Sequence, residues 1–218
     1  MAIVKSGQVG DFNGKIGQAV IAKWRQLTVG RSTPRKSTKK ASEEQLDIQS
    51  KFKLVTSFVS RIGTTIALGY RNSAGNLTPQ NTAVQYHIQN AVTGGYPAYA
   101  IDMAKVVLSN PRMLNDIDAA SSYVMSNVVD NRVTITWVPK FQVFIERTMQ
   151  TDLLLVVFYN VTENAFMSAY AEGPRMALSS EFIVPQDRPT DVIHAWAFFV
   201  SANKKFVSKS TYLGLVQA

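Results

Sequence analysis

The residues in this sequence whose types and spacing could do chemistry are the lysines and arginines near its start. The first forty residues contain nine of them and one acidic residue, Asp11, whereas the remainder has fourteen basic and fourteen acidic residues. A block of like charges is typical of a segment that binds a polyanion or an acidic groove on a partner subunit. The alternative is a solvated tail that only keeps the chain soluble. The residues expected to make partner or polyanion contacts are Lys15, Lys23, Trp24, Arg25, Arg31, Arg35, Lys36, Lys39 and Lys40.

Two aromatic residues lie among these charges and leave two interpretations open. Phe12 and Trp24 are interleaved with lysines and arginines, and such aromatic rings can stack on bases while the charges hold phosphates. The other interpretation is a hairpin whose aromatic side covers a core, since an isolated hairpin needs such cover to be stable.

Patterns typical of catalysis or metal binding are absent from the sequence. His87 and His194 have no histidine, cysteine or carboxylate at metal-ligand spacing, so both are expected to be structural. The segment Gly10–Ile16 resembles a phosphate-binding loop, but it is too short and ends in isoleucine where a magnesium-binding hydroxyl belongs. Asp116 and Asp118 are expected to lie in a solvated turn. Without cysteine or a nucleophile elbow, the sequence predicts a non-enzymatic protein with no catalytic residue, cofactor or metal site.

The basic segment itself is expected to form a hairpin followed by a linker. Asn13-Gly14 is a turn signal, and residues 18–29 alternate loosely between apolar and polar, which predicts a strand pair within residues 7–33. Residues 31–41 form a basic linker that contains Pro34 and no long apolar side chain.

Two helices are predicted next. Ser42 and Gln45 form a capping box for a helix that Gly69 or the asparagines after it end. The second helix is expected over residues 79–92, capped by Thr78, with a loop at residues 93–97. The apolar stripe of the first helix faces either the core or a helix of another subunit; its members are Ile48, Phe52, Val55, Val59, Ile62 and Ile66.

From Ile101 onward, short β-rich runs are separated by turn residues. Seven such runs predict an antiparallel β-sandwich, and Trp137 is placed like the early-strand tryptophan of fibronectin III or immunoglobulin-like domains. The expected strands are Ala104–Leu108, Arg132–Val138, Leu153–Val161, Ala165–Ala171, Leu178–Val184, Val192–Val200 and Phe206–Gly214. The fold class is therefore α+β, mainly β. Its regions are a basic hairpin and arm (1–41), a helical region (42–100) and a β-sandwich domain (101–218).

Several blocks carry a resemblance to a known family. They are Gly14-Lys15-Ile16-Gly17, Trp24, Arg31-Ser32 before Pro34, Gln45, Phe52, Asn90-Ala91-Val92-Thr93-Gly94 with Tyr96-Pro97, Ile101-Asp102 and Ser109. With these blocks the chain resembles, over essentially its whole length, an uncharacterised family common in Bacteroidota. The resemblance implies no activity. Similar N-terminal arms in proteins that look phage-derived favour an assembly role.

These observations lead to one hypothesis and two alternatives. The first is a multi-copy structural subunit of a phage-like particle, tube or filament, whose arm binds sister copies or other assembly subunits. The alternative is a nucleic-acid-binding module that uses the same arm. A weaker alternative is a small-ligand or carbohydrate site, for which Tyr159, Tyr170 and Trp196 are generic candidates. The start of the sequence has no signal-peptide pattern and its longest apolar run is strand-sized, so we expect cytoplasmic synthesis, no membrane partner and a place in a released particle.

Overall fold

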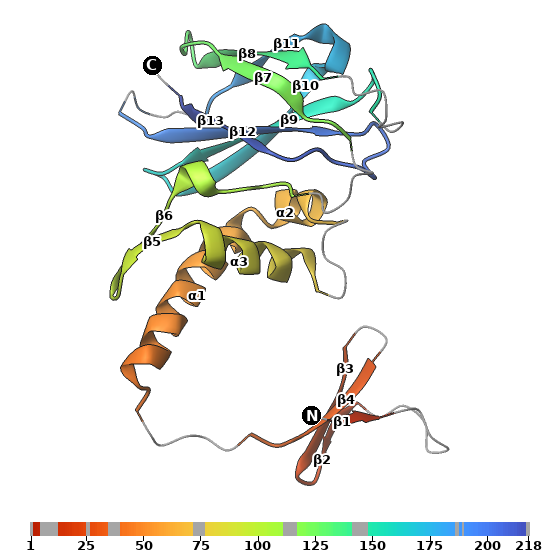
Figure 1. The fold of residues 1–218 in the computed structure, drawn as a ribbon, viewed down its shortest axis with the longest axis vertical. Helices are drawn as coiled ribbons and strands as arrows, with labels where there is room; N and C mark the ends of the chain where they lie inside the picture. Colours follow the sequence, from red (N-terminus) through yellow and green to blue (C-terminus); the bar gives the residue numbers. More distant parts are fainter. Residues whose placement is uncertain are drawn as a thin grey trace. The chain divides into compact units, whose positions relative to one another are not determined.

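A computed structural model describes residues 2–4, 13–24, 27–34, 40–71, 77–110, 117–140, 148–185, 188 and 190–216 (Figure 1). The chain divides into two compact units, Met1–Ser42 and Glu43–Ala218. The first unit is a small sheet, and the second holds the helices together with the larger sheets.

The first unit is an antiparallel sheet in the strand order β1-β4-β3-β2. Its tight turn lies at Gly17-Gln18, where Ile16 pairs with Ala19 and Gly17 adopts a φ of +55° that glycine tolerates. The turn expected at Asn13-Gly14 is therefore wrong, because Gly14 begins a strand. The strands are β1 (Ala2–Val4), β2 (Gly14–Ile16), β3 (Ala19–Trp24) and β4 (Leu27–Ser32).

The first predicted helix is two helices, α1 (Glu43–Arg61) and α2 (Gly63–Gly69). The break lies at Ile62, whose ψ of 25° departs from helical geometry. Gly69 ends α2 as expected. Glycine is favoured at this position because a Cβ would overlap the carbonyl oxygen of Leu108.

The helix α3 (Pro79–Asn90) begins as predicted, with the Thr78 hydroxyl accepting a hydrogen bond from the Asn81 amide at 3.2 Å. It ends before Val92, because that residue starts a hairpin of β5 (Val92–Gly95) and β6 (Ala98–Ile101). The loop predicted at residues 93–97 is thus mostly strand, with Tyr96 and Pro97 in its turn.

Two antiparallel sheets make up the rest of the second unit, in the orders β10-β9-β12-β13 and β11-β8-β7. Figure 1 shows the helices on one side of the first sheet and the second sheet on its other side. The strands are β7 (Ala120–Met125), β8 (Arg132–Pro139), β9 (Leu153–Asn160), β10 (Ala165–Pro174), β11 (Ser179–Ile183), β12 (Ile193–Val200) and β13 (Thr211–Leu215).

Two of the strand predictions need correction. Residues 104–108 form the end of a 3-10 turn (Met103–Lys105) and an irregular segment, because the Leu108 and Ser109 amides bond to the Ser210 hydroxyl instead of a strand. The last strand starts at Thr211 rather than at Phe206. Strand β7 was not among the predicted strands.

The central strands β9 and β12 are apolar except for Asn160 and His194, and both of their faces are covered. Leu155, Val157, Trp196 and Phe198 pack in a cluster with helix residues such as Val59. The alternate residues of both strands, including Leu154, Val156, Ala197 and Phe199, pack in a second cluster with Val133, Ile135 and Trp137 of β8. The helices and the sheets of the second unit are therefore joined through one central sheet, and the predicted mainly β chain with helices and antiparallel sheets is confirmed.

Candidate functional site

The sheet of the first unit carries three of the four predicted basic residues whose side chains the structure describes. Lys15, Lys23 and Arg31 lie on β2, β3 and β4 and are exposed, as is Lys40 beyond the sheet. Trp24 lies in β3 opposite Leu27. The side chain of Trp24, and the whole of Arg25, Arg35, Lys36 and Lys39, lie outside the described residues.

The register of this sheet separates the basic residues between its two faces. Val20 pairs with Lys15 on one side and with Arg31 on the other, so these three side chains share a face. Lys23 lies an odd number of positions from Val20 and belongs to the opposite face. The described charges therefore do not form the single basic patch that their spacing in sequence suggests.

The same sheet has no buried core among its described side chains. Val20, Ala22 and Val29 lie on one face and Ile16 and Ile21 on the other, yet none of them is buried. A small sheet without a covered apolar face is marginally stable in water. The unit therefore presents apolar side chains, flanked by positive charge, that additional contacts would stabilise.

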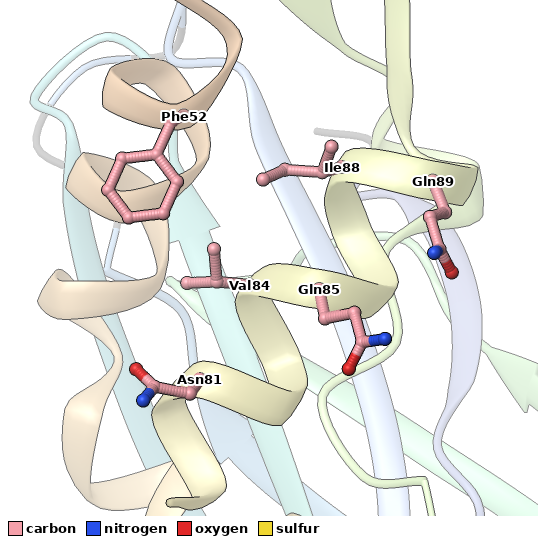
Figure 2. A pocket seen from close by; sticks show the side chains of 6 residues that line it. All are labelled: Phe52, Asn81, Val84, Gln85, Ile88 and Gln89. Carbon is pink, nitrogen blue, oxygen red and sulfur yellow. The ribbon is translucent and has the colours of Figure 1, made fainter. Parts of the chain in front are cut away.

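A groove on the second unit lies between α1 and α3 (Figure 2). It has a volume of about 310 Å³. Phe52, Val84 and Ile88 turn towards the space between the two helices, whereas Gln85 and Gln89 point to the side of α3 away from α1 in this view. The complete lining is Phe52, Asn81, Val84, Gln85, Ile88 and Gln89. The groove is thus apolar at its base and neutral at its rim.

The hairpin β5–β6 is tied to the first half of α1 by a polar cluster. The Tyr99 hydroxyl donates to Asp47, and the Lys51 ammonium lies 2.9 Å from the other Asp47 oxygen and 4.9 Å from the centre of the Tyr99 ring. The hydrogen bond from Tyr99 and that from Lys51 lower the pKa of Asp47. Asp47 and Lys51 therefore contact the hairpin, whereas the side chain of α1 that lines the groove is the apolar Phe52.

Both histidines have structural hydrogen bonds. The Val107 amide donates to Nε2 of the buried His87 at 3.2 Å, so its Nδ1 carries the proton and donates to the Ala83 carbonyl at 2.7 Å. Burial lowers the pKa of His87 and keeps the ring neutral. His194 lies 2.6 Å from the Tyr212 hydroxyl. The described residues contain no cluster that could hold a metal ion.

A buried ion pair is a feature that the sequence analysis missed. The Arg175 guanidinium lies 3.3 Å from Asp152 and 3.8 Å from the Phe199 ring, and both charged side chains are at most 1% exposed. Arg175 also donates to the carbonyl of Asp118 at 2.7 Å. Asp118 is buried, so its expected place in a solvated turn is wrong, and Asp116 lies outside the described residues. A lone arginine in sequence gives no sign of such a partner.

The suggested aromatic ligand groove is wrong for two of its three residues. Tyr159 and Trp196 are buried in the cluster between the central sheet and the helices. Tyr170 is partly exposed, and the Lys204 ammonium lies 5.3 Å from its ring. Tyr159 and Trp196 are therefore placed for packing.

Comparison with known proteins places the chain in a family. Residues 11–214 match the model of a family described as "Family of unknown function (DUF6266)". The chain belongs to this family. Membership of DUF6266 confirms the resemblance to an uncharacterised family, while a Bacteroidota or phage origin stays a prediction. No curated protein matches the chain.

One similar solved structure is the solution structure of the fn3 domain of human collagen alpha-1(XX) chain. It shares 8% sequence identity at a TM-score of 0.36, and the match covers 50% of this chain and 91% of that one. Among the described residues, no helix has the length and apolar character needed to cross a membrane.

Proposed function

We propose that this protein is a non-enzymatic structural subunit that assembles in multiple copies through its N-terminal unit, as in a phage-like particle, tube or filament. The observation that carries the proposal is a separate four-stranded sheet whose described side chains include no buried residue. Contact with a neighbouring subunit would cover its apolar side chains or extend its edges by strand addition.

We propose further that the two larger sheets form a fibronectin III or immunoglobulin-like sandwich, which serves as the body of the subunit. The second core cluster, to which both sheets contribute, supports this interpretation. So does the chain path, which changes sheet between β8 and β9, β10 and β11, and β11 and β12. Trp137 lies in this cluster and donates a hydrogen bond to the Arg175 carbonyl at 2.8 Å.

Deletion of residues 1–41 tests the assembly role and retains Ser42 before α1. All buried core residues of the two clusters lie in the second unit, so the shortened chain is expected to fold. Native mass by light scattering should show a multi-copy species for the full chain and nothing above a dimer for the shortened one. Nuclease treatment should leave both masses unchanged. Equal masses for the two chains, or a full chain that never assembles, would contradict the proposal.

The alternative of nucleic-acid binding is favoured by the exposure of Lys15, Lys23, Arg31 and Lys40. Binding through phosphates would weaken with added salt, with a logarithmic slope of about −0.9 per phosphate contacted on duplex DNA. The assembly proposal instead predicts that the original chain has no salt-dependent affinity for DNA or RNA. Replacement of Lys15, Lys23 and Arg31 by glutamine should therefore leave the nucleic-acid affinity unchanged. Salt-dependent affinity of the original chain that these replacements abolish would favour the alternative.

A further inference from the structure

The pair Asn13-Gly14 does not form the turn expected from its residue types and lies at the start of an edge strand instead. Asn13 is exposed and precedes β2, and Gly14 is exposed and begins it. The strand β2 has three residues and is outermost in its sheet. The end of such a short edge strand opens readily, so the backbone at these two residues can change conformation.

An asparagine side chain can react with the backbone amide of the residue that follows it, which makes asparagine a thermolabile residue. The reaction closes a five-membered ring, and a side chain on the following residue hinders it. Gly14 has no side chain, and its φ of +131° is one that other residues rarely adopt. Among the described residues, no atom beyond its chain neighbours lies within 4 Å of a Cβ built on Gly14. Asn13 is the only asparagine in the sequence that glycine follows.

We propose that Asn13 is a site of spontaneous deamidation, in which the backbone nitrogen of Gly14 attacks Cγ of Asn13. The Gly14 amide gives its proton to a base in the solvent, the N–Cγ bond forms, and the side-chain nitrogen of Asn13 takes up a proton and leaves as ammonia. Water then opens the cyclic imide. Attack of water at Cγ gives aspartate, and attack at the main-chain carbonyl carbon of residue 13 gives isoaspartate. The only co-reactant is water.

The reaction changes the charge and the backbone at the edge of the N-terminal sheet. Either product replaces a neutral amide by a carboxylate, in a segment where Asp11 is the sole acidic residue against nine basic ones. Isoaspartate also lengthens the main chain just before the pair of Gly14 and Ile21, where β2 begins. Each chain reacts by itself, so this inference is independent of the proposed assembly role.

Prolonged incubation of the full chain at neutral pH, followed by peptide mapping with mass spectrometry, tests the reaction. We expect conversion at residue 13, release of an equal amount of ammonia, and a more acidic species on ion exchange. Asn131 is the matched control within the same chain, because it is also exposed and has a φ of +57°, but Arg132 follows it. An unconverted Asn13, or conversion at Asn131 that equals that at Asn13, would overturn the proposal.

Two variants test the role of the Gly14 nitrogen. In Gly14→Ala the added methyl group hinders the attack and should slow the conversion about tenfold or more. Because alanine is strained at this φ, Asn13→Gln is the second variant. It retains an amide beside Gly14 but would have to close a larger ring, so conversion at residue 13 should also slow about tenfold or more. Undiminished conversion in either variant would overturn the proposal.

Discussion

At the scale of single residues, two buried polar groups decide how the second unit responds to pH and to substitution. His87 is neutral and fully hydrogen-bonded, and Arg175 forms its ion pair with Asp152 away from solvent. The sequence predicted a structural role for His87, since no ligand lay near it. It did not predict the Arg175 pair, because the two partners meet only through the folded strands.

We predict that the free energy of unfolding decreases as the pH falls below about 6.5, the pKa of an unfolded histidine. Burial lowers the pKa of His87 in the folded chain, so the unfolded chain takes up the proton at a higher pH than the folded chain. Protonation therefore stabilises the unfolded state relative to the folded state as the pH falls. The loss is at most about 1.4 kcal/mol per pH unit for one such group. Chemical denaturation between pH 7 and pH 5 measures it.

His87→Asn should lose this part of the pH dependence, since asparagine retains a donor for the Ala83 carbonyl but does not titrate. His194→Asn is the comparison, because the pKa of His194 is also lowered by burial although its side chain is only half-buried. An undiminished slope in His87→Asn would show that other groups bind the protons.

We predict that Arg175→Met destabilises the fold by about 3–5 kcal/mol, because it leaves the Asp152 carboxylate buried without its cation. Burial raises the pKa of Asp152, and the Met149 amide and Arg175 oppose that shift. The double variant Arg175→Met, Asp152→Asn should recover part of the loss. Urea denaturation measures all three free energies.

The matched control for this prediction is the exposed pair of Arg132 and Glu181, which lie 3.4 Å apart across β8 and β11. Arg132→Met should cost less than about 1 kcal/mol, since water screens both charges. Equal losses at the two arginines would mean that burial adds nothing to the Arg175 pair.

At the scale of elements, sequence patterns predicted the elements whose signals are strong. The starts of α1 and α3 follow their capping residues, and the continuous apolar runs gave β9 and β12. Strand β7 was missed because serines interrupt its alternation. The segment at residues 104–108 has strand-like residues, but its Val107 and Leu108 amides bond to the side chains of His87 and Ser210 instead of to a strand. Tertiary contacts decided these cases, and the sequence does not show them.

Because their surroundings differ, the two glycines of α2 are predicted to respond in opposite ways to replacement by alanine. Gly69→Ala should destabilise the fold by about 1–3 kcal/mol, since its Cβ would overlap the Leu108 carbonyl. Gly63→Ala should stabilise it by about 0.5–1 kcal/mol, because no atom lies within 4 Å of the added Cβ and alanine favours the helix. Thermal unfolding compares the two. A similar change at both positions would contradict the close approach.

At the scale of the whole molecule, charge and core are separated between the two units. The excess positive charge belongs to the first forty residues, while both core clusters lie beyond residue 42. The sequence predicted this charged segment. It did not predict that Lys15 and Arg31 lie on one face of the sheet and Lys23 on the other, because this follows from the strand pairing in the structure. One residue of the groove could also be predicted from the sequence, since Phe52 belongs to the apolar stripe of the first helix.

The most direct measurement is hydrogen exchange of the β3 and β4 amides in the full chain at increasing protein concentration. If the N-terminal sheet obtains its cover from neighbouring copies, these amides should exchange rapidly in dilute protein and become protected as subunits associate, while β9 and β12 stay protected throughout. Strong protection of β3 and β4 that does not depend on concentration would contradict the account, because the sheet would then be stable within a single chain.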